Sequence, residues 1–167
     1  VVDGAGFLMN NEMDDFSVKP GVPNMYGLLG GEANAIEPEK RMLSSMTPTI
    51  VLKDGEVWLV LGTPGGSTII TSVAQVMMNI IDFGMDPFEA VAASRYHHQW
   101  SPDLVYCEEG VFSDESRAGL EKKGHKLKER SLIGDVQLIM KDGSTLTGVS
   151  DPRRDGLSRG TGDTSGN

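Results

Sequence analysis

Two segments of the chain share one construction, in which an Asp-Gly pair separates two runs of strand-forming residues. They are "TIVLKDGEVWLVLG" at residues 49–62 and "VQLIMKDGSTLTGVS" at residues 136–150. Asp-Gly between such runs favours the tight turn of a β-hairpin, so both segments are predicted hairpins. The first is apolar at nearly every position from Val57 to Leu61. We therefore expect it to be central and covered on both faces, and the second to lie nearer a sheet edge.

Helical patterns lie between the two hairpins. Apolar residues recur at helical spacing from Ile69 to Ile80, with Ser67 or Thr68 available as N-cap and Gly84 just past the end. Asp86 precedes a short predicted helix that starts at Pro87, and a further helix is expected from Ser113 to a stop at Gly124, a total of three. Hairpins grouped with helices indicate layered α and β structure, and the predicted fold class is α+β.

The length of 167 residues suits one domain with a real core. We expect a single domain over residues 1–156 and a flexible tail over 157–167, which is Gly- and Ser-rich. Residues 17–40 contain three prolines and no apolar period, so they are predicted to form a long loop. The chain opens at Val1 without an initiator Met or a signal-peptide pattern, and we expect a processed subunit or a fragment.

Composition excludes several classes of function. The net charge of −9 argues against nucleic acid as a partner, since phosphate backbones require clustered Lys and Arg. No apolar run is long enough for a membrane span, and the single cysteine, Cys107, has no internal disulfide partner. The neighbouring His97 and His98 diverge on any regular backbone, so we predict neither a metal site nor another cofactor.

Two short motifs could bind anions. "LGTPGGS" at 61–67 runs from a predicted strand through paired glycines into a helix, a geometry that presents backbone N–H groups to a phosphate, a carboxylate or a developing oxyanion. A plain strand-to-helix connection is an equal alternative for this motif. Ser44 and Ser45 could bind a carboxylate, although adjacent serines are also common in turns.

A cluster of acids and amides lies in "FLMNNEMDDFS" at residues 7–17. The order of its carboxylates does not match a calcium-binding loop, which needs them at alternate positions around a central Gly. Two interpretations remain open on the residues alone. The cluster is either a solvated turn or a pocket for an ammonium group.

Taken in order, these motifs resemble one family. The chain contains "FLMNNEMDDF", "KPGVPNMYGL", "KRMLSSMTPTIVLKDG", "LGTPGGSTIIT", "YHHQW" with Tyr96 where the family has Phe, and "DPRRDG". This series resembles the small, C-terminal subunit of the γ-glutamyltransferases (γ-glutamyl transpeptidases), particularly the bacterial ones. The resemblance extends from Phe7 to about Gly156, which is nearly the whole chain.

The resemblance implies an N-terminal-nucleophile hydrolase fold, an α/β/β/α sandwich built from two chains cut from one precursor. In such enzymes a Thr freed by autocleavage attacks the γ-amide of glutathione or a related γ-glutamyl donor. The resulting γ-glutamyl-enzyme transfers its acyl group to an amino acid, a peptide or water. The expected partners are therefore the large subunit, a γ-glutamyl donor and an acceptor, and the expected location is periplasmic or secreted.

The resemblance also implies roles for individual residues. Gly65 and Gly66 match the backbone N–H donors of the oxyanion hole. Glu12 and Asp15 match the acids that receive the substrate α-ammonium, whereas Asp14 is left to structure or solvent. The residues that match the α-carboxylate site and the lid are Ser44, Ser45 and Tyr26.

The sequence departs from the family pattern at two places. It begins beyond the family's Thr-Thr-His, so no residue in it is the nucleophile, and Thr68 stands where the family usually has Arg. One alternative function is a cephalosporin or glutaryl acylase of the same superfamily, against which the acids Glu12 and Asp15 argue. The other is a non-catalytic, truncated ligand-binding module.

Overall fold

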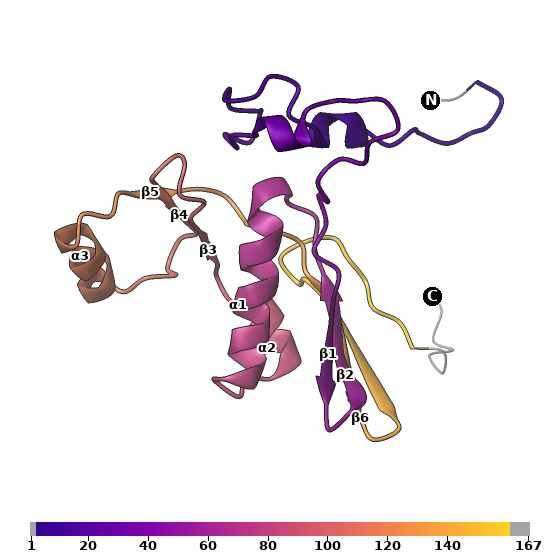
Figure 1. Ribbon diagram of the computed structural model, residues 1–167. Coiled ribbons are helices and arrows are strands. Elements are labelled where there is room, and N and C mark those ends of the chain that lie inside the picture. Colours follow the sequence, from indigo (N-terminus) through magenta and orange to yellow (C-terminus); the bar gives the residue numbers. More distant parts are fainter. Residues whose placement is uncertain (1–2, 161–167) are drawn as a thin grey trace. The chain divides into compact units, whose positions relative to one another are not determined.

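The computed structural model describes residues 3–160, which form two compact units divided between Met46 and Thr47 (Figure 1). The single domain expected over 1–156 stays a prediction. The expectations about Val1 and about the part of the tail from residue 161 onwards lie outside the described residues.

The first unit contains two 3₁₀ helices, η1 (Glu12–Asp15) and η2 (Glu32–Asn34). The segment between them is otherwise irregular, as the prolines and glycines of residues 17–40 predict. It is nevertheless tied together at its base by isolated bridges that pair Ser17 with Ala35 and Pro23 with Leu29. The long predicted loop is thus closed at its base, because its two ends are paired with each other.

The second unit is built on a four-stranded antiparallel sheet and confirms both predicted hairpins. Its strand order is β1-β2-β6-β7, with bounds Thr49–Lys53, Glu56–Gly62, Gln137–Asp142 and Thr145–Ser150. Asp54 and Gly55 both have positive φ in the first turn, as a tight two-residue hairpin turn requires.

The expected division into a central and an edge hairpin is wrong. Each hairpin supplies one edge strand, β1 or β7, and one inner strand, β2 or β6. The inner pair is joined by the register of Leu61 opposite Leu138. A hairpin's own apolar content cannot decide this, because pairing between hairpins depends on residues about 77 positions apart in the chain.

Helices α1 (Ile69–Ile81) and α2 (Pro87–Ala92) cover one face of this sheet (Figure 1). The core between helices and sheet is made by side chains that share near-complete burial: Leu59, Leu61, Val73, Val76, Ile80, Ala90, Val91, Val136, Leu138 and Val149. Asp86 caps α2 as predicted, since its side chain accepts from the Phe88 N–H at 2.8 Å. The start of α1 is different. A 3₁₀ turn, η3 (Gly66–Thr68), precedes it and no side chain caps it.

The opposite face of the sheet is exposed within the described chain, although β2 was expected to be covered on both faces. Ile50, Val60 and Ile139 lie in one row across three strands, and Leu52 and Leu146 are on edge strands. Four of these five side chains are 48–67 % exposed, and Val60 is 39 % exposed. Leu59 and Leu61 of β2 thus face the core, and Val60 lies on the opposite side. We call the five exposed residues on that side, Ile50, Leu52, Val60, Ile139 and Leu146, the apolar sheet face.

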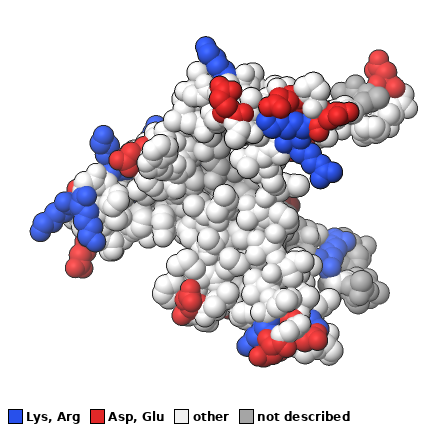
Figure 2. Space-filling model, in the orientation of Figure 1, with Lys and Arg blue, Asp and Glu red and all other residues white. Residues whose placement is uncertain are grey.

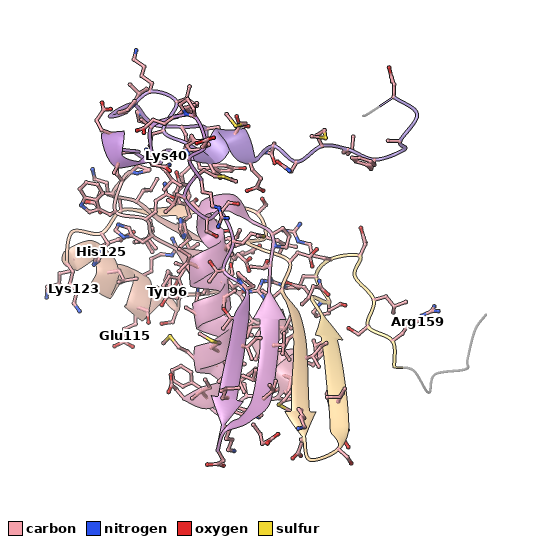
Figure 3. All side chains as sticks on the ribbon, turned by 45° about the vertical axis from the view of Figure 1, so that its right-hand side comes forward. Lys40, Tyr96, Glu115, Lys123, His125 and Arg159 are labelled. Atoms are coloured by element: carbon pink, nitrogen blue, oxygen red, sulfur yellow. The ribbon has the colours of Figure 1, made fainter. Side chains whose placement is uncertain are left out.

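A second, three-stranded sheet has the order β3-β4-β5, with bounds Tyr96–His97, Val105–Cys107 and Leu127–Glu129. Helix α3 (Asp114–Lys122) precedes β5, and Ser113 caps it as predicted by accepting from the Ser116 N–H at 3.2 Å. Tyr96, labelled in Figure 3, is fastened to α1 through Gln75, which donates to its carbonyl at 2.8 Å. Strand β3 of this sheet is therefore hydrogen-bonded to α1 through Gln75.

Charged side chains gather at the tips of the hairpins, at the bottom of Figure 2, where Lys141 pairs with Glu56 at 3.3 Å. Within residues 3–160, no helix combines the length and the apolar character that crossing a membrane would need.

Candidate functional site

The acids of the first unit are sorted by η1. Residues three apart on a 3₁₀ helix eclipse each other, so Glu12 and Asp15 lie on one side of it. Both are half-buried, whereas Asp14 is exposed. Phe16 follows the helix and is only 7 % exposed, so a buried side chain lies directly beside this short element.

Ser45 meets one of these acids across 33 residues of chain. Its hydroxyl donates to Oε2 of Glu12 at 3.3 Å, in a half-buried position. The hydroxyl of the exposed Ser44 instead donates to the carbonyl of Met46 at 3.3 Å. An acid and a hydroxyl donor therefore lie side by side, a combination that is complementary to an ammonium and a carboxylate on one carbon.

Asn34 connects the end of η1 to the stretch that leads to Ser44 and Ser45. The sequence alone did not identify this residue. Its Nδ2 donates to the carbonyl of Asp15 at 2.7 Å, and its Oδ1 accepts from the Leu43 N–H at 2.9 Å. The amide thus fixes the end of η1 against the stretch that leads to the serines. Nothing local to Asn34 marks it, because both partners are 9–19 residues away.

Tyr26 lies in a turn at the far end of the closed loop. Asn24 organises this turn, because its Oδ1 accepts from the N–H groups of Tyr26 at 2.9 Å and Leu28 at 3.0 Å. The Tyr26 side chain is 47 % exposed. At the base of the loop, Gly21 donates to the carbonyl of Gly30 at 2.8 Å, so the turn is carried by a closed stem.

The glycine pair lies in the second unit, between β2 and η3. Gly65 has φ 150° and Gly66 has φ 57°, a backbone that residues with a Cβ rarely adopt. A Cβ on Gly65 would lie 2.6 Å from the Thr68 hydroxyl. Among the described residues, neither glycine N–H has a hydrogen-bond acceptor, so both donors remain available for an anion.

A hollow of about 340 Å³ opens beside Gly65. Arg130 and Arg154 contribute its cationic groups and Asp135 its acid, and the remaining wall comes from Pro64, Gly65, Thr68, Leu132 and Gly134. Arg154 is oriented by donating to the carbonyls of Leu132 at 2.9 Å and Gly134 at 3.1 Å. The glycine pair is therefore next to an open, cationic part of the second unit.

A buried ion network lies behind this loop. Arg95 donates to Asp151 at 2.9 Å, and Arg153 bridges Asp151 at 2.8 Å and Glu108 at 2.6 Å. The two carboxylates and Arg95 are at most 3 % exposed. Burial lowers the pKa of Arg95 and raises that of Asp151, and the ion pair between them opposes both shifts.

The network also holds the loop before β6. Arg95 donates to the carbonyl of Ile133 at 2.9 Å, and the Ile133 N–H donates to Glu108. In the sequence, "DPRRDG" stands out only as a family motif, and no local pattern indicates a role for Arg95 or Glu108. Their partners lie up to 56 residues away.

The tandem histidines diverge as expected. His97 is buried and bonded to Thr71 at 2.9 Å and to Gln99 at 2.8 Å, whereas His98 pairs with Asp103 at the surface. Burial lowers the pKa of His97. Across residues 3–160, no three side chains of the His, Cys, Asp or Glu type converge as a metal site.

Comparison with known proteins places the chain in one family. The family model described as gamma-glutamyltranspeptidase matches residues 1–161. The "Glutathione hydrolase proenzyme" of Escherichia coli K12 is 56 % identical over 155 residues, covering 92 % of this chain and 26 % of its own length. The protein of the same name from Pseudomonas aeruginosa is 52 % identical over 160 residues. The chain thus spans 26–29 % of the length of these two relatives.

Solved structures agree. A mutant of Helicobacter pylori gamma-glutamyltranspeptidase superposes with a TM-score of 0.87 at 52 % identity, covering 92 % of this chain and 85 % of that one. A cephalosporin acylase from Bacillus halodurans is more distant, with a TM-score of 0.68 at 32 % identity over 74 % of this chain. The predicted α+β fold of the N-terminal-nucleophile hydrolases is confirmed.

Proposed function

The chain belongs to the gamma-glutamyltranspeptidase family, and from this premise we propose that it is part of an enzyme that cleaves γ-glutamyl amides. The proposed donor is glutathione or a related compound, and the γ-glutamyl group passes through an acyl-enzyme to an amino acid, a peptide or water. No residue of this chain is assigned as nucleophile. The remainder of the protein, which the relatives' greater length suggests, would supply it.

The contact between Ser45 and Glu12 is the observation that carries this proposal. A γ-glutamyl donor has a free α-amino acid end, with an ammonium and a carboxylate on one carbon. We assign the ammonium to Glu12 and the neighbouring Asp15, where charge-assisted hydrogen bonds favour a cation. The hydroxyls of Ser45 and Ser44 are assigned to the carboxylate, which requires both to rotate away from their present acceptors.

Gly65 and Gly66 are assigned to the oxyanion of the tetrahedral intermediate. Their support is that both N–H groups lack an acceptor among the described residues and follow a strand into a helix start. Tyr26 is assigned to a lid over the bound donor, because it lies on a closed excursion of the loop and is half-exposed.

Two alternatives are less well supported. An acylase for glutaryl side chains would have no use for an acidic socket, and the acylase likeness is the weaker one at 32 % identity. A non-catalytic binding module is consistent with the absence of a nucleophile from this chain. It predicts that the complete protein binds γ-glutamyl compounds without turnover.

The test is made on the complete protein with two chromogenic donors, a γ-glutamyl anilide and the corresponding glutaryl anilide that lacks the ammonium. Asp15→Asn removes one anionic partner of the ammonium. It is expected to raise KM for the γ-glutamyl donor by roughly 10- to 100-fold, since a hydrogen bond to a charged group is worth about 1.5–3 kcal/mol. Glutaryl anilide hydrolysis should be unchanged or improved.

Asp14→Asn is the matched control, because it removes the same charge from the exposed neighbour. We expect its KM to equal that of the wild type. An Asp15→Asn enzyme with unchanged KM would remove the socket assignment, and a wild type that prefers the glutaryl donor would favour the acylase.

A periplasmic or secreted location and a large-subunit partner are proposed on family membership alone. Mass spectrometry of the mature protein tests the second. It should find this chain within a small subunit that begins with Thr, together with a separate large subunit.

A further inference from the structure

Two threonine hydroxyls flank the glycine pair and have no role in the function proposed above. The Thr63 hydroxyl donates to the carbonyl of Pro64 at 2.7 Å. The Thr68 hydroxyl donates to the carbonyl of Gly65 at 2.9 Å, and the Thr68 N–H reaches the same oxygen at 3.2 Å. Both acceptors are carbonyls of the peptide units that lead into the glycines.

Peptide planarity links these carbonyls to the proposed oxyanion donors. In a trans peptide unit, the C=O of one residue and the N–H of the next point in opposite directions within one plane. The Pro64 carbonyl therefore sets the direction of the Gly65 N–H. The Gly65 carbonyl sets that of the Gly66 N–H in the same way.

These peptide planes need an external restraint. Glycine has access to both signs of φ, and the two residues here take φ 150° and 57°. The two units could therefore rotate readily if nothing held their carbonyls. Each carbonyl is held by one threonine hydroxyl, and the Gly65 carbonyl also accepts from the Thr68 N–H at the longer distance of 3.2 Å.

The threonines are themselves fixed. Thr63 Oγ1 accepts from the Asp135 N–H at 2.7 Å, and Asp135 lies two residues after Ile133, which the buried ion network holds. Thr68 is only 4 % exposed, and its carbonyl accepts from the Thr71 hydroxyl at 3.1 Å. The chain of contacts therefore runs from the interior to the glycine peptides.

We propose that Thr63 and Thr68 are positioning residues that aim the Gly65 and Gly66 N–H groups at the oxyanion. The inference rests on the proposed function of the glycine pair. It also gives a role to Thr68, which stands where the family pattern has Arg. The Thr68 hydroxyl orients the Gly65–Gly66 peptide unit directly. A Cβ on Gly65 would collide with that hydroxyl, at 2.6 Å, which accounts for glycine at this position.

The expected effect falls on the chemical step. The oxyanion exists only in the transition state and intermediate, so misdirected N–H groups lower kcat and leave donor KM nearly unchanged. Loss of one oxyanion donor costs roughly 10²–10³ in rate, and misdirection should cost at least about 10-fold.

The test uses matched variants of the complete protein. Thr63→Val and Thr68→Val keep the size of the side chain and remove the hydroxyl, whereas Thr63→Ser and Thr68→Ser keep it. We expect each Val variant to lose at least about 10-fold in kcat and each Ser variant to stay within about 3-fold of wild type. Thr49→Val is the control, because the Thr49 hydroxyl bonds the Thr47 carbonyl away from the glycines.

A second readout separates aiming from general stability. A γ-glutamyl boronic acid forms a tetrahedral adduct with an oxygen where the oxyanion would form. Its inhibition constant should rise in the Val variants in step with the loss of kcat/KM, while the KM for the donor stays constant. If a Val variant fails to fold, the corresponding Ala variant repeats the measurement without either γ-methyl group.

The inference is overturned if the wild type is active and the Val or Ala variants match it in kcat and boronate inhibition, or if Ser variants lose as much as Val variants. A wild type without γ-glutamyl hydrolysis would instead overturn the proposed function. The two failures are therefore distinguishable.

Discussion

At the scale of single residues, Asp151 has the most demanding environment. It is fully buried and accepts from Arg95 and from the side chain and N–H of Arg153, at distances of 2.8–3.1 Å. Asp151→Asn leaves the buried guanidinium of Arg95 and the partly buried one of Arg153 facing one remaining acid, Glu108. We expect it to lower the free energy of unfolding of the complete protein by about 3–5 kcal/mol.

Thermal or urea unfolding checks this, with Lys141→Ala as the control at the exposed hairpin-tip pair with Glu56. Loss of that pair should cost under about 1 kcal/mol. Equal effects at the two sites would mean that the buried network contributes no more than a surface ion pair.

His97 provides a prediction about pH. Burial lowers its folded-state pKa below the ordinary 6.5, so the folded protein favours the neutral ring. The stability linked to His97 is complete above the unfolded-state pKa. It is lost as the pH falls below 6.5 towards the folded-state pKa, because the unfolded state then binds the proton first.

We therefore expect the melting temperature to fall between pH 7 and pH 5, and His97→Gln, which cannot be charged, to flatten that dependence. His98→Gln is the control substitution at the neighbouring surface position. A slope unchanged in His97→Gln would assign the acid sensitivity to other groups.

The residues that could be predicted from sequence are those whose neighbours in the chain explain them. Gly65 and Gly66 follow a strand and precede a helix, so the turn that leaves their N–H groups without acceptors is local, and their oxyanion role stays a prediction. The proposed ammonium role of Glu12 and Asp15 was suggested only by the order of several motifs, and it too stays a prediction. Asn34 and Glu108 could not be found, because their value comes entirely from partners distant in sequence.

At the scale of elements, hairpin turns and two of the three helix caps were predictable because each depends on adjacent residues. The exception is α1. Thr68 has the right chemistry for a cap, but its hydroxyl bonds back to the Gly65 carbonyl and a 3₁₀ turn opens the helix. The competing local hydrogen bond explains the difference.

Helix α3 allows one substitution to be tested at two positions with opposite expected signs. Gly119 lies in the helix, and an added Cβ would meet nothing within 4 Å. Gly119→Ala should stabilise the protein by about 0.5–1 kcal/mol. Gly124 is equally open but has φ 94° beyond the helix end, so Gly124→Ala should destabilise it.

The melting temperatures of Gly119→Ala and Gly124→Ala test this prediction: the first should rise and the second should fall. A shift of the same sign in both would show that backbone conformation does not govern the effect.

At the scale of the whole molecule, the apolar sheet face dominates the second unit. Ile50, Val60 and Ile139 form an exposed row, beside a hollow of about 420 Å³ that the 157–159 segment also lines. Patches of this kind mark interfaces or aggregation sites. The chain expressed alone is therefore expected either to self-associate or to have a low melting temperature.

Size-exclusion chromatography and binding of a hydrophobic dye check this prediction against the complete protein. A monomeric chain that does not bind the dye and melts cooperatively would contradict it. Ile139→Thr should improve the solubility of the isolated chain, because it removes an exposed apolar side chain at the β6 end of the row.

The apolar sheet face also bears on how such a protein is assembled. Suppose that the apolar sheet face and the segment that packs on it are made as one covalent precursor. The two then meet at an effective concentration of the order of millimolar, whatever the protein concentration. Two separately synthesised chains would have to find each other in dilute solution. Cutting the precursor only after folding would then make assembly independent of dilution, whereas mixing the finished chains would not.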